Sequence, residues 1–294
     1  MPELPEVETV RRSLAPYVEG AVIESVTLNR KDLRTPFPRG FAKALEGKTI
    51  ERVERRAKYL LFRLSSGKTW IAHLGMTGSF RFKGITLDKR SRYFEPVVDE
   101  KHDHVVVELK HPRHGTLTMI FADARRFGTM NLIASDEESV EIGDLGPEPL
   151  SNQFNAAEMA DRFRNKATPV KAALLDQRVV AGLGNIYVSE ALHRAHIRPT
   201  VQAKKLVLKS GAATRRLEDL AAAIPTVLTE AIEVGGSTLR DFRSGDGAEG
   251  GYQHRFAVYD REGKPCPTPA CTGVIKRIVQ SGRSTYYCPV CQKP

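Results

Sequence analysis

The sequence predicts an α+β protein of two domains: a β-sandwich with a leading helix, then a helical domain that ends in a β-hairpin module. Three observations support this prediction. Short alternating apolar runs separated by turn residues fill 21–134, helical periodicity dominates 153–234, and a Gly- and Pro-containing stretch at 145–151 separates them. At 294 residues, the chain is long enough for two separate cores.

The leading helix is predicted over residues 1–20. Val7, Val10, Leu14 and Val18 recur at spacings of three and four, and Pro5 suits a first helical turn. Strands follow at 21–28, 59–64, 69–74, 104–109 and 117–121, with turn signals at 66–67 and 111–115. The polar stretch 84–100 is predicted to be a long surface loop.

The second half is predicted to be helical at 154–163, 171–177, 186–195 and 217–234, and its last 40 residues return to short strand-like runs. The predicted domains are therefore 1–144, a linker at 145–152, a helical domain at 153–252, and a terminal module at 253–294.

Composition and charge restrict the class of protein. Hydrophobic residues make up 41% and charged residues 27%, as expected of a globular chain, and no apolar run reaches the ~18 residues that a membrane helix needs. Early acidic residues and the lack of an apolar signal region predict a cytoplasmic protein. The net charge is +10, and residues 151–294 hold 21 basic against 13 acidic side chains, which favours a polyanionic partner.

All four cysteines lie in the last 29 residues, as Cys266-x4-Cys271 and Cys288-x2-Cys291. Two close pairs separated by a hairpin-length spacer are typical of one tetrahedral, structural Zn²⁺ ion. Disulfides fit poorly with a chain that has no secretion signal. Basic residues and no acidic ones lie between the pairs, so the hairpin suits a phosphate backbone, and Arg283 near its tip is the strongest candidate for the contact.

The opening residues Pro2 and Glu3 could form an unusual reactive group. Removal of Met1 would expose a secondary amine beside a carboxyl group, and an α-amino group titrates near pH 8, so part of it is neutral and nucleophilic at pH 7. The alternative is a simple helix start, with proline and acidic residues in the first turn. These residues alone leave both interpretations open.

Five internal motifs complete the pattern. They are Arg56-Ala57-Lys58-Tyr59-Leu60, His73-Leu74-Gly75-Met76-Thr77-Gly78, Lys101-His102-Asp103-His104, Asp123-Ala124-Arg125-Arg126-Phe127-Gly128 and Gly182-Leu183-Gly184-Asn185-Ile186-Tyr187. With both ends of the chain, they resemble the bacterial formamidopyrimidine-DNA glycosylase family over the full length. The resemblance implies a base excision repair enzyme that removes oxidised purines from double-stranded DNA and cleaves abasic sites, with a helix–two-turns–helix element and a zinc finger. A single active site with a single finger favours a monomer.

The resemblance also implies the catalytic groups. Pro2 would attack C1′ of the damaged nucleoside and form a Schiff base, after which β,δ-elimination cleaves the strand. Glu3 would act as general acid and base. Lys58 would hold a phosphate near the lesion and keep Pro2 deprotonated, and Arg283 would complete the catalytic set. Glu6 would support the pocket, or serve only the helix start.

Extruding a nucleotide leaves a gap in the stack. By the same resemblance, Met76 fills that gap, Arg125 bonds the orphaned base, and Phe127 is an apolar wedge. Core packing is the alternative for Met76 and Phe127. Further DNA contacts are implied for His73, His102, Arg126, Lys171 and Asn185, although His73 could equally satisfy a hydrogen bond in the core.

Two features leave alternatives open. The family usually has two residues between the first cysteines, whereas Cys266 and Cys271 are separated by four. The sequence around 235–252, with four glycines in 244–252, resembles the strip that reads the extruded base, or is a plain loop. The rival functions are an endonuclease VIII-like glycosylase for oxidised pyrimidines and a non-catalytic binder of damaged DNA.

Overall fold

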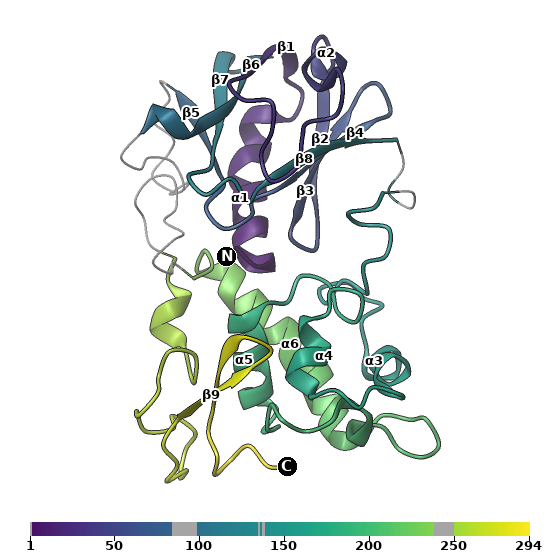
Figure 1. The fold of residues 1–294 in the computed structure, drawn as a ribbon, viewed down its shortest axis with the longest axis vertical. Coiled ribbons are helices and arrows are strands. Elements are labelled where there is room, and N and C mark those ends of the chain that lie inside the picture. Colours follow the sequence, from purple (N-terminus) through teal and green to yellow (C-terminus); the bar gives the residue numbers. More distant parts are fainter. Residues whose placement is uncertain (1, 84–98, 135, 137–138, 238–249) are drawn as a thin grey trace. The chain divides into compact units, whose positions relative to one another are not determined.

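The computed structural model describes residues 2–83, 99–134, 136, 139–237 and 250–294. The chain forms two compact units (Figure 1). The first contains Met1–Asp144 and the described part of Gly235–Gly251, and the second contains Leu145–Val234 and Tyr252–Pro294. This division differs from the predicted helical domain at 153–252. Most of the predicted loop at 84–100 and of the glycine-rich strip at 244–252 lies outside the described residues.

Helix α1 (Leu4–Val18) confirms the leading helix. Its apolar stripe of Val7, Val10, Leu14 and Val18 is buried, as the spacing predicts. Pro5 lies within the first turn, where its missing N–H costs nothing. The helix contacts β2, β3 and β6, which belong to both sheets of the first unit (Figure 1).

Two antiparallel four-stranded sheets form the sandwich. One has the strand order β1-β6-β7-β5 and the other β2-β3-β4-β8. The bounds are β1 Val22–Leu28, β2 Ile50–Arg56, β3 Tyr59–Leu64, β4 Thr69–His73, β5 Ser79–Lys83, β6 Asp103–His111, β7 Gly115–Ala122 and β8 Thr129–Ile133. A short helix α2 (Phe41–Leu45) and a 3-10 turn η1 (Glu100–His102) complete the described elements of this unit.

One hydrophobic core joins the α1 stripe to both sheets. It includes Phe62 and Trp70 from the second sheet and Phe80 and Phe121 from the first. Trp70 is fully buried and stacks on Phe62 with ring centroids 4.4 Å apart. The catalytic candidates at the start of α1 are therefore fixed to a continuous, well-packed core.

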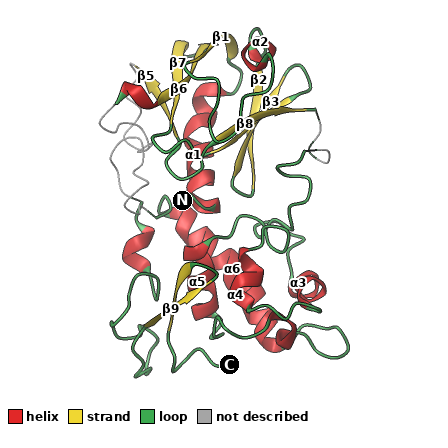
Figure 2. Cartoon of the chain, in the orientation of Figure 1, coloured by secondary structure: helices red, strands yellow, loops and turns green. Residues whose placement is uncertain are grey.

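The second unit is helical, as Figure 2 shows. Its helices are α3 (Ala156–Phe163), α4 (Val170–Leu175), α5 (Asn185–Arg194) and α6 (Arg215–Glu233), with 3-10 turns η2 (Ala203–Leu206) and η3 (Tyr252–Arg255). Thr214 and Asn155 cap α6 and α3 through their side chains. None of the helices in the described part of the chain is long and apolar enough to cross a membrane.

A two-stranded hairpin, β9 (Lys276–Gln280) and β10 (Arg283–Tyr287), lies between the cysteine pairs. Ser281 and Gly282 form its tip with φ of +48° and +72°, the double left-handed conformation of a tight hairpin turn. The α+β prediction is thus confirmed: a β-sandwich with a leading helix, a helical region and a cysteine-bounded hairpin.

Candidate active site and nucleic-acid interface

Pro2 and Glu3 are both buried, immediately before α1. The backbone N–H of Glu3 donates to Glu6 Oε2 at 2.9 Å, so Glu6 supplies the side-chain half of a capping box at the helix start. The start of the chain is therefore held by the helix that follows it. The two interpretations of Pro2 and Glu3, helix start and reactive amine, are compatible in this geometry.

Glu6 also holds a distant segment. Its Oε1 accepts hydrogen bonds from the N–H of Ser237 at 2.7 Å and from the Ser237 hydroxyl at 3.1 Å. Gly236 has φ +78°, and a Cβ there would lie 2.7 Å from the same Oε1, so the close approach requires glycine. Ser237 also pairs with Gly251 in an isolated bridge, so these two described residues lie side by side near the start of α1.

Lys58 lies in the tight turn between β2 and β3, where Arg56 pairs with Tyr59. Its neighbour Ala57 has φ +52°, a left-handed conformation that is uncommon without glycine. Lys58 itself is only 7% exposed, which argues against an ordinary solvated lysine. Its positive charge lies close enough to His73, the last residue of β4, to affect that ring.

Burial, with the positive charges of Lys58 and Arg34, lowers the pKa of His73 to about 4. Its Nδ1 accepts the N–H of Gly75 at 3.0 Å, so the neutral ring carries its proton on Nε2. Tyr59 packs against the ring at 4.9 Å between centroids. His73 satisfies a local hydrogen bond through one nitrogen and keeps a donor on the other.

This environment predicts a pH dependence of stability. Because the folded pKa of His73, about 4, lies below the usual value of 6.5, the unfolded chain binds the proton more readily. The stability from neutral His73 is present above pH 6.5 and is lost as the pH falls toward 4.

In His73→Gln, the free energy of unfolding should fall less steeply over that range, by up to about 1.4 kcal/mol per pH unit. Denaturant titrations at several pH values measure this slope. An unchanged slope in His73→Gln, with exposed His114→Gln as the control, would contradict it.

Met76, Arg125 and Phe127 lie in two adjacent turns at one end of the sandwich, after β4 and after β7. Phe127 is 43% exposed, and the Arg125 guanidinium carbon lies 5.0 Å from its ring centroid. Met76 is half-buried. The exposure of Phe127 argues against core packing and leaves the ring accessible to a ligand.

A buried carboxylate braces these turns. Asp123 is fully buried, and its two oxygens accept hydrogen bonds from the Thr77 hydroxyl and, at 2.8 Å, from the N–H of Gly128. The Thr77 hydroxyl oxygen also accepts the N–H of Arg125 at 3.0 Å. The intervening Arg126 adopts φ +55°. Sequence reasoning missed Asp123 and Thr77 as site residues, although both lie within the motifs it singled out.

Substitution of Gly75 should separate the two turns. Gly75 has φ +62°, and a Cβ there would lie 2.3 Å from the backbone carbon of Phe127. We expect Gly75→Ala to destabilise the protein by about 1–3 kcal/mol and to displace Phe127, which would weaken the insertion into DNA that the family resemblance implies for this ring. Denaturant unfolding and a fluorescent base analogue beside the lesion measure the two effects. Gly67→Ala is the matched control, because Gly67 has φ +77° but open space around it; equal effects of the two changes would contradict the prediction.

Two further candidate phosphate contacts, Arg126 and His102, lie on this unit. Arg126 is exposed, and its guanidinium lies 3.8 Å from the carboxylate of Asp32 in a surface ion pair, which is weak. His102 ends η1, and its ring nitrogen lies 3.9 Å from the Asp99 carboxylate. Both side chains can exchange these surface partners for a phosphate at little cost.

In the second unit, two turns join α4 to α5 and one glutamine holds them together. The Gln177 amide nitrogen donates to the carbonyls of Leu175 and Leu183, and its oxygen accepts the N–H of Gly182. Gly182 has φ +85°, which glycine adopts without strain. Asn185 is the first residue of α5 and follows the N-cap residue Gly184, so the positive end of the helix dipole lies at this element.

Asn185 and Lys171 both reach the β9–β10 hairpin. Their side-chain nitrogens each donate to the Ser284 carbonyl at 3.0 Å, and Lys171 Nζ also donates to the Thr285 hydroxyl at 2.6 Å. Lys171 is fully buried. These bonds fix the position of Arg283, which begins β10, is exposed and precedes Ser284.

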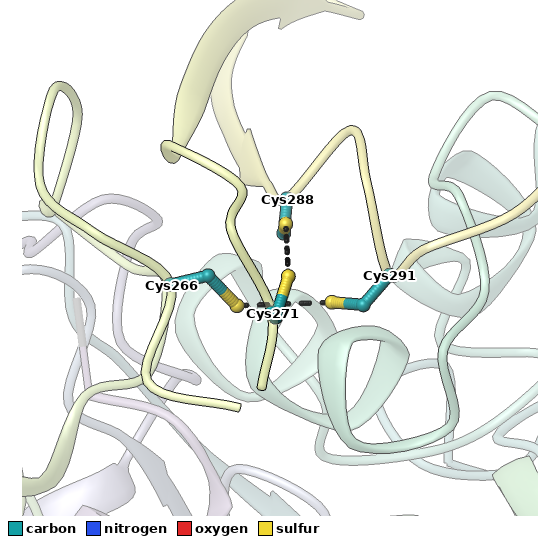
Figure 3. Close-up of side chains that lie close together, drawn as sticks. All are labelled: Cys266, Cys271, Cys288 and Cys291. Carbon is teal, nitrogen blue, oxygen red and sulfur yellow. Dashed lines mark hydrogen bonds between the residues drawn. The ribbon is translucent and has the colours of Figure 1, made fainter. Parts of the chain in front are cut away.

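The four cysteines meet at one point, as Figure 3 shows. Cys266 Sγ lies 3.7 Å from Cys291 Sγ, Cys271 Sγ lies 3.6 Å from Cys288 Sγ, and all four sulfurs lie within 4.8 Å of one another. A tetrahedron with Zn–S bonds of about 2.3 Å has S–S edges of about 3.8 Å, so the cluster fits Zn²⁺. The four-residue spacing therefore still brings both sulfurs of the first pair to the metal position.

These features define a class of protein: a β-sandwich unit with a leading helix, joined to a helix–two-turns–helix unit that carries a zinc hairpin. The family models match these parts in the same order along the chain. Residues 1–130 match the formamidopyrimidine-DNA glycosylase N-terminal domain, residues 145–243 match its H2TH domain, and residues 263–294 match the zinc finger found in FPG and IleRS.

Comparisons over the whole chain lead to the same family. The formamidopyrimidine-DNA glycosylases of Azorhizobium caulinodans and Caulobacter vibrioides are each 52% identical to this chain, over 100% and 99% of it and the whole of each relative. The MutM (Fpg) protein of Thermus thermophilus superposes with a TM-score of 0.80 at 41% identity, and both chains are fully covered. The Lactococcus lactis Fpg bound to abasic-site DNA gives 0.81 at 34%, over 99% and 100% of the two chains. This chain belongs to the formamidopyrimidine-DNA glycosylase family.

Proposed function

We propose that this protein is a bifunctional DNA glycosylase and abasic-site lyase of base excision repair, which removes oxidised purines from duplex DNA in the bacterial cytoplasm. The observation that carries the proposal is the buried position of Pro2 and Glu3 at the start of a helix anchored in the sandwich core. Full-length identity of 52% to named glycosylases supports it.

Pro2 is the proposed nucleophile. Its secondary amine attacks C1′ of the damaged nucleoside as the bond from C1′ to the base breaks. The bond from C1′ to the sugar ring oxygen then breaks, which opens the ring and leaves a Schiff base (iminium) between the nitrogen and C1′. Glu3 lies next to Pro2 in the chain and supplies the carboxyl group that protonates the sugar ring oxygen. Loss of a proton from C2′ then expels the phosphate on C3′, and loss of a proton from C4′ expels the phosphate on C5′. Lys58, buried in the adjacent strand turn, is placed to contribute a cation to a phosphate and to the electrostatics of the site.

The two turns that carry Met76, Arg125 and Phe127 are proposed to stabilise the distorted duplex. The Phe127 ring is exposed and lies against the Arg125 guanidinium, in a turn that is held by buried hydrogen bonds. Such a ring suits insertion between bases. Arg125 carries the donors that the orphaned base needs, and cytosine offers acceptors at O2 and N3. His73, His102 and Arg126 are proposed phosphate contacts on the same unit.

The second unit is proposed to hold the backbone around the lesion. The N-terminus of α5 offers the positive end of its helix dipole to a phosphate, and Asn185 and Lys171 fix the basic hairpin from which Arg283 projects. Bound through the four thiolates, zinc supplies structural stability without an open coordination position, so it takes no part in the chemistry.

Borohydride trapping of the whole protein tests this function. Duplexes that contain 8-oxoguanine, an oxidised pyrimidine, or no damage are incubated with the protein and reduced. We expect a covalent adduct with the 8-oxoguanine duplex and none with intact duplex. Stronger trapping on the oxidised pyrimidine would favour the endonuclease VIII-like alternative, and binding without any adduct would favour the non-catalytic binder.

A further inference from the structure

A buried histidine from outside the zinc hairpin lies against the cysteine cluster. His193, near the end of α5, is 6% exposed, and its Nε2 lies 3.5 Å from Cys266 Sγ and 3.9 Å from Cys291 Sγ. Helix α5 belongs to the helix–two-turns–helix element, so the contact joins the two modules of the second unit. Nothing in the reaction described above uses this ring.

The unusually wide cysteine turn supplies a second polar group at the same place. Thr268 lies between Cys266 and Cys271, and its hydroxyl oxygen is 3.3 Å from His193 Nε2 and 3.8 Å from Cys291 Sγ. One proton assignment satisfies these contacts together. The ring shares its Nε2–H between Cys266 Sγ and the Thr268 oxygen, while the hydroxyl donates to Cys291 Sγ.

The position of the ring is that of a donor to the ligands, not of a ligand. The group of side chains whose ligand atoms all lie within 4.8 Å of one another consists of the four cysteines, without His193. Four thiolates around Zn²⁺ carry a net charge of −2, and this excess is stabilised by N–H and O–H donors. Such outer donors orient the sulfur ligands and retain the metal.

Two neighbouring contacts fix the ring against the cluster. Glu190, one turn earlier on α5, accepts the backbone N–H groups of Ala257, Val258 and Tyr259 at 2.8, 3.1 and 2.8 Å, on the segment that leads to the first cysteine pair. Gln292 donates to the Ile197 carbonyl at 2.8 Å and accepts the N–H of Cys288 at 2.7 Å. Helix α5 and Ile197, three residues beyond its end, are therefore bonded to the chain on both sides of the metal position.

We propose that His193, together with Thr268 of the wide cysteine turn, is an outer-shell positioning residue of the zinc site, which donates hydrogen bonds to the thiolates of Cys266 and Cys291. The pair links retention of zinc to helix α5, whose first residue, Asn185, holds the hairpin. The inference concerns the metal site and does not depend on the glycosylase reaction.

Zinc transfer from the intact protein to a colorimetric chelator, without DNA, tests this role. His193→Phe keeps a planar ring without a donor and should lower zinc affinity by about 10- to 100-fold, the usual effect of losing an outer-shell partner. His193→Gln retains an N–H donor and should restore part of the loss. His196→Asn is the matched control, because His196 is exposed on the same stretch and its φ of +56° suits asparagine.

The cobalt-substituted protein gives a second, spectroscopic readout. Loss of a donor to a thiolate raises the energy of the sulfur electrons, so the thiolate-to-Co²⁺ charge-transfer band should move to longer wavelength in His193→Phe and, by less, in Thr268→Val. Zinc transfer and band position equal to wild type in both variants would overturn the proposal. So would equal effects of His193→Phe and His196→Asn. Should His193→Phe fail to fold, the half-buried Thr268→Val and the rescue by His193→Gln decide the outcome.

Discussion

Replacement of Pro2 by glycine is expected to reduce the borohydride-trapped adduct on 8-oxoguanine duplex at least about 100-fold. Glycine leaves a primary amine that is not held by a ring, and misplacement of a reacting group by about 1 Å can alone cost a factor of this size. A secondary amine also yields the cationic iminium directly, without loss of a second proton. Gel separation of the adduct after reduction measures the effect, and peptide mass spectrometry locates the link.

Pro5→Ala is the matched control for this change. Pro5 lies in the first turn of the same helix, where alanine is well tolerated, and the change leaves the chain start untouched. Full trapping by Pro2→Gly, or full activity of a form that retains Met1, would show that the proposed nucleophile is wrong. Loss of trapping in Pro5→Ala as well would point to damage to the helix start instead.

Replacement of Cys288 by serine should disable DNA binding while it leaves the sandwich folded. Cys288 is fully buried in the small core of the zinc module. Zinc binding contributes on the order of 10 kcal/mol to folding of such modules, so its loss should release the β9–β10 hairpin and Arg283. We expect the affinity for lesion duplex to fall by more than about 100-fold, as measured by fluorescence anisotropy at fixed salt.

The single tryptophan makes the two units separately observable. Trp70 is fully buried in the core of the first unit, so its emission reports on the sandwich. It should be unchanged in Cys288→Ser, whereas far-ultraviolet circular dichroism should lose signal from the second unit. Val290→Ser, an exposed neighbour in the same cysteine turn, is the control. Wild-type affinity without bound zinc would contradict the prediction.

Sequence periodicity predicted the elements that have one clear buried face. The apolar stripe of the first 20 residues became α1, and the helices and central strands lie within a few residues of their predicted bounds. Strand β2 was missed because five of its seven residues are charged and its burial falls only on Ile50 and Val53. Its place in the sheet comes from pairing with β3, which no local pattern encodes.

The candidate site shows the same limit. The motifs singled out Met76, Arg125 and Phe127, and the structure finds them in the segments between β4 and β5 and between β7 and β8. No sequence pattern indicated that one carboxylate, Asp123, accepts a hydrogen bond from Thr77, 46 residues away in the other turn. Nor did it indicate that Lys171 and Asn185 converge on the Ser284 carbonyl, because such contacts between distant segments depend on the tertiary fold.

The bond between Glu6 and Ser237 joins residues 231 positions apart within the first unit. A fragment ending at Asp144 would keep all eight strands β1 to β8. It would lack Ser237, so the Glu6 carboxylate oxygen would lose both of its hydrogen-bond donors. A buried acceptor without a hydrogen-bond donor costs about 1–3 kcal/mol of folding free energy. An amino-terminal half produced by splitting the gene at the linker should therefore be less stable to unfolding than the same unit in the whole chain. A circular permutant that supplies 235–251 in the same chain should recover that stability.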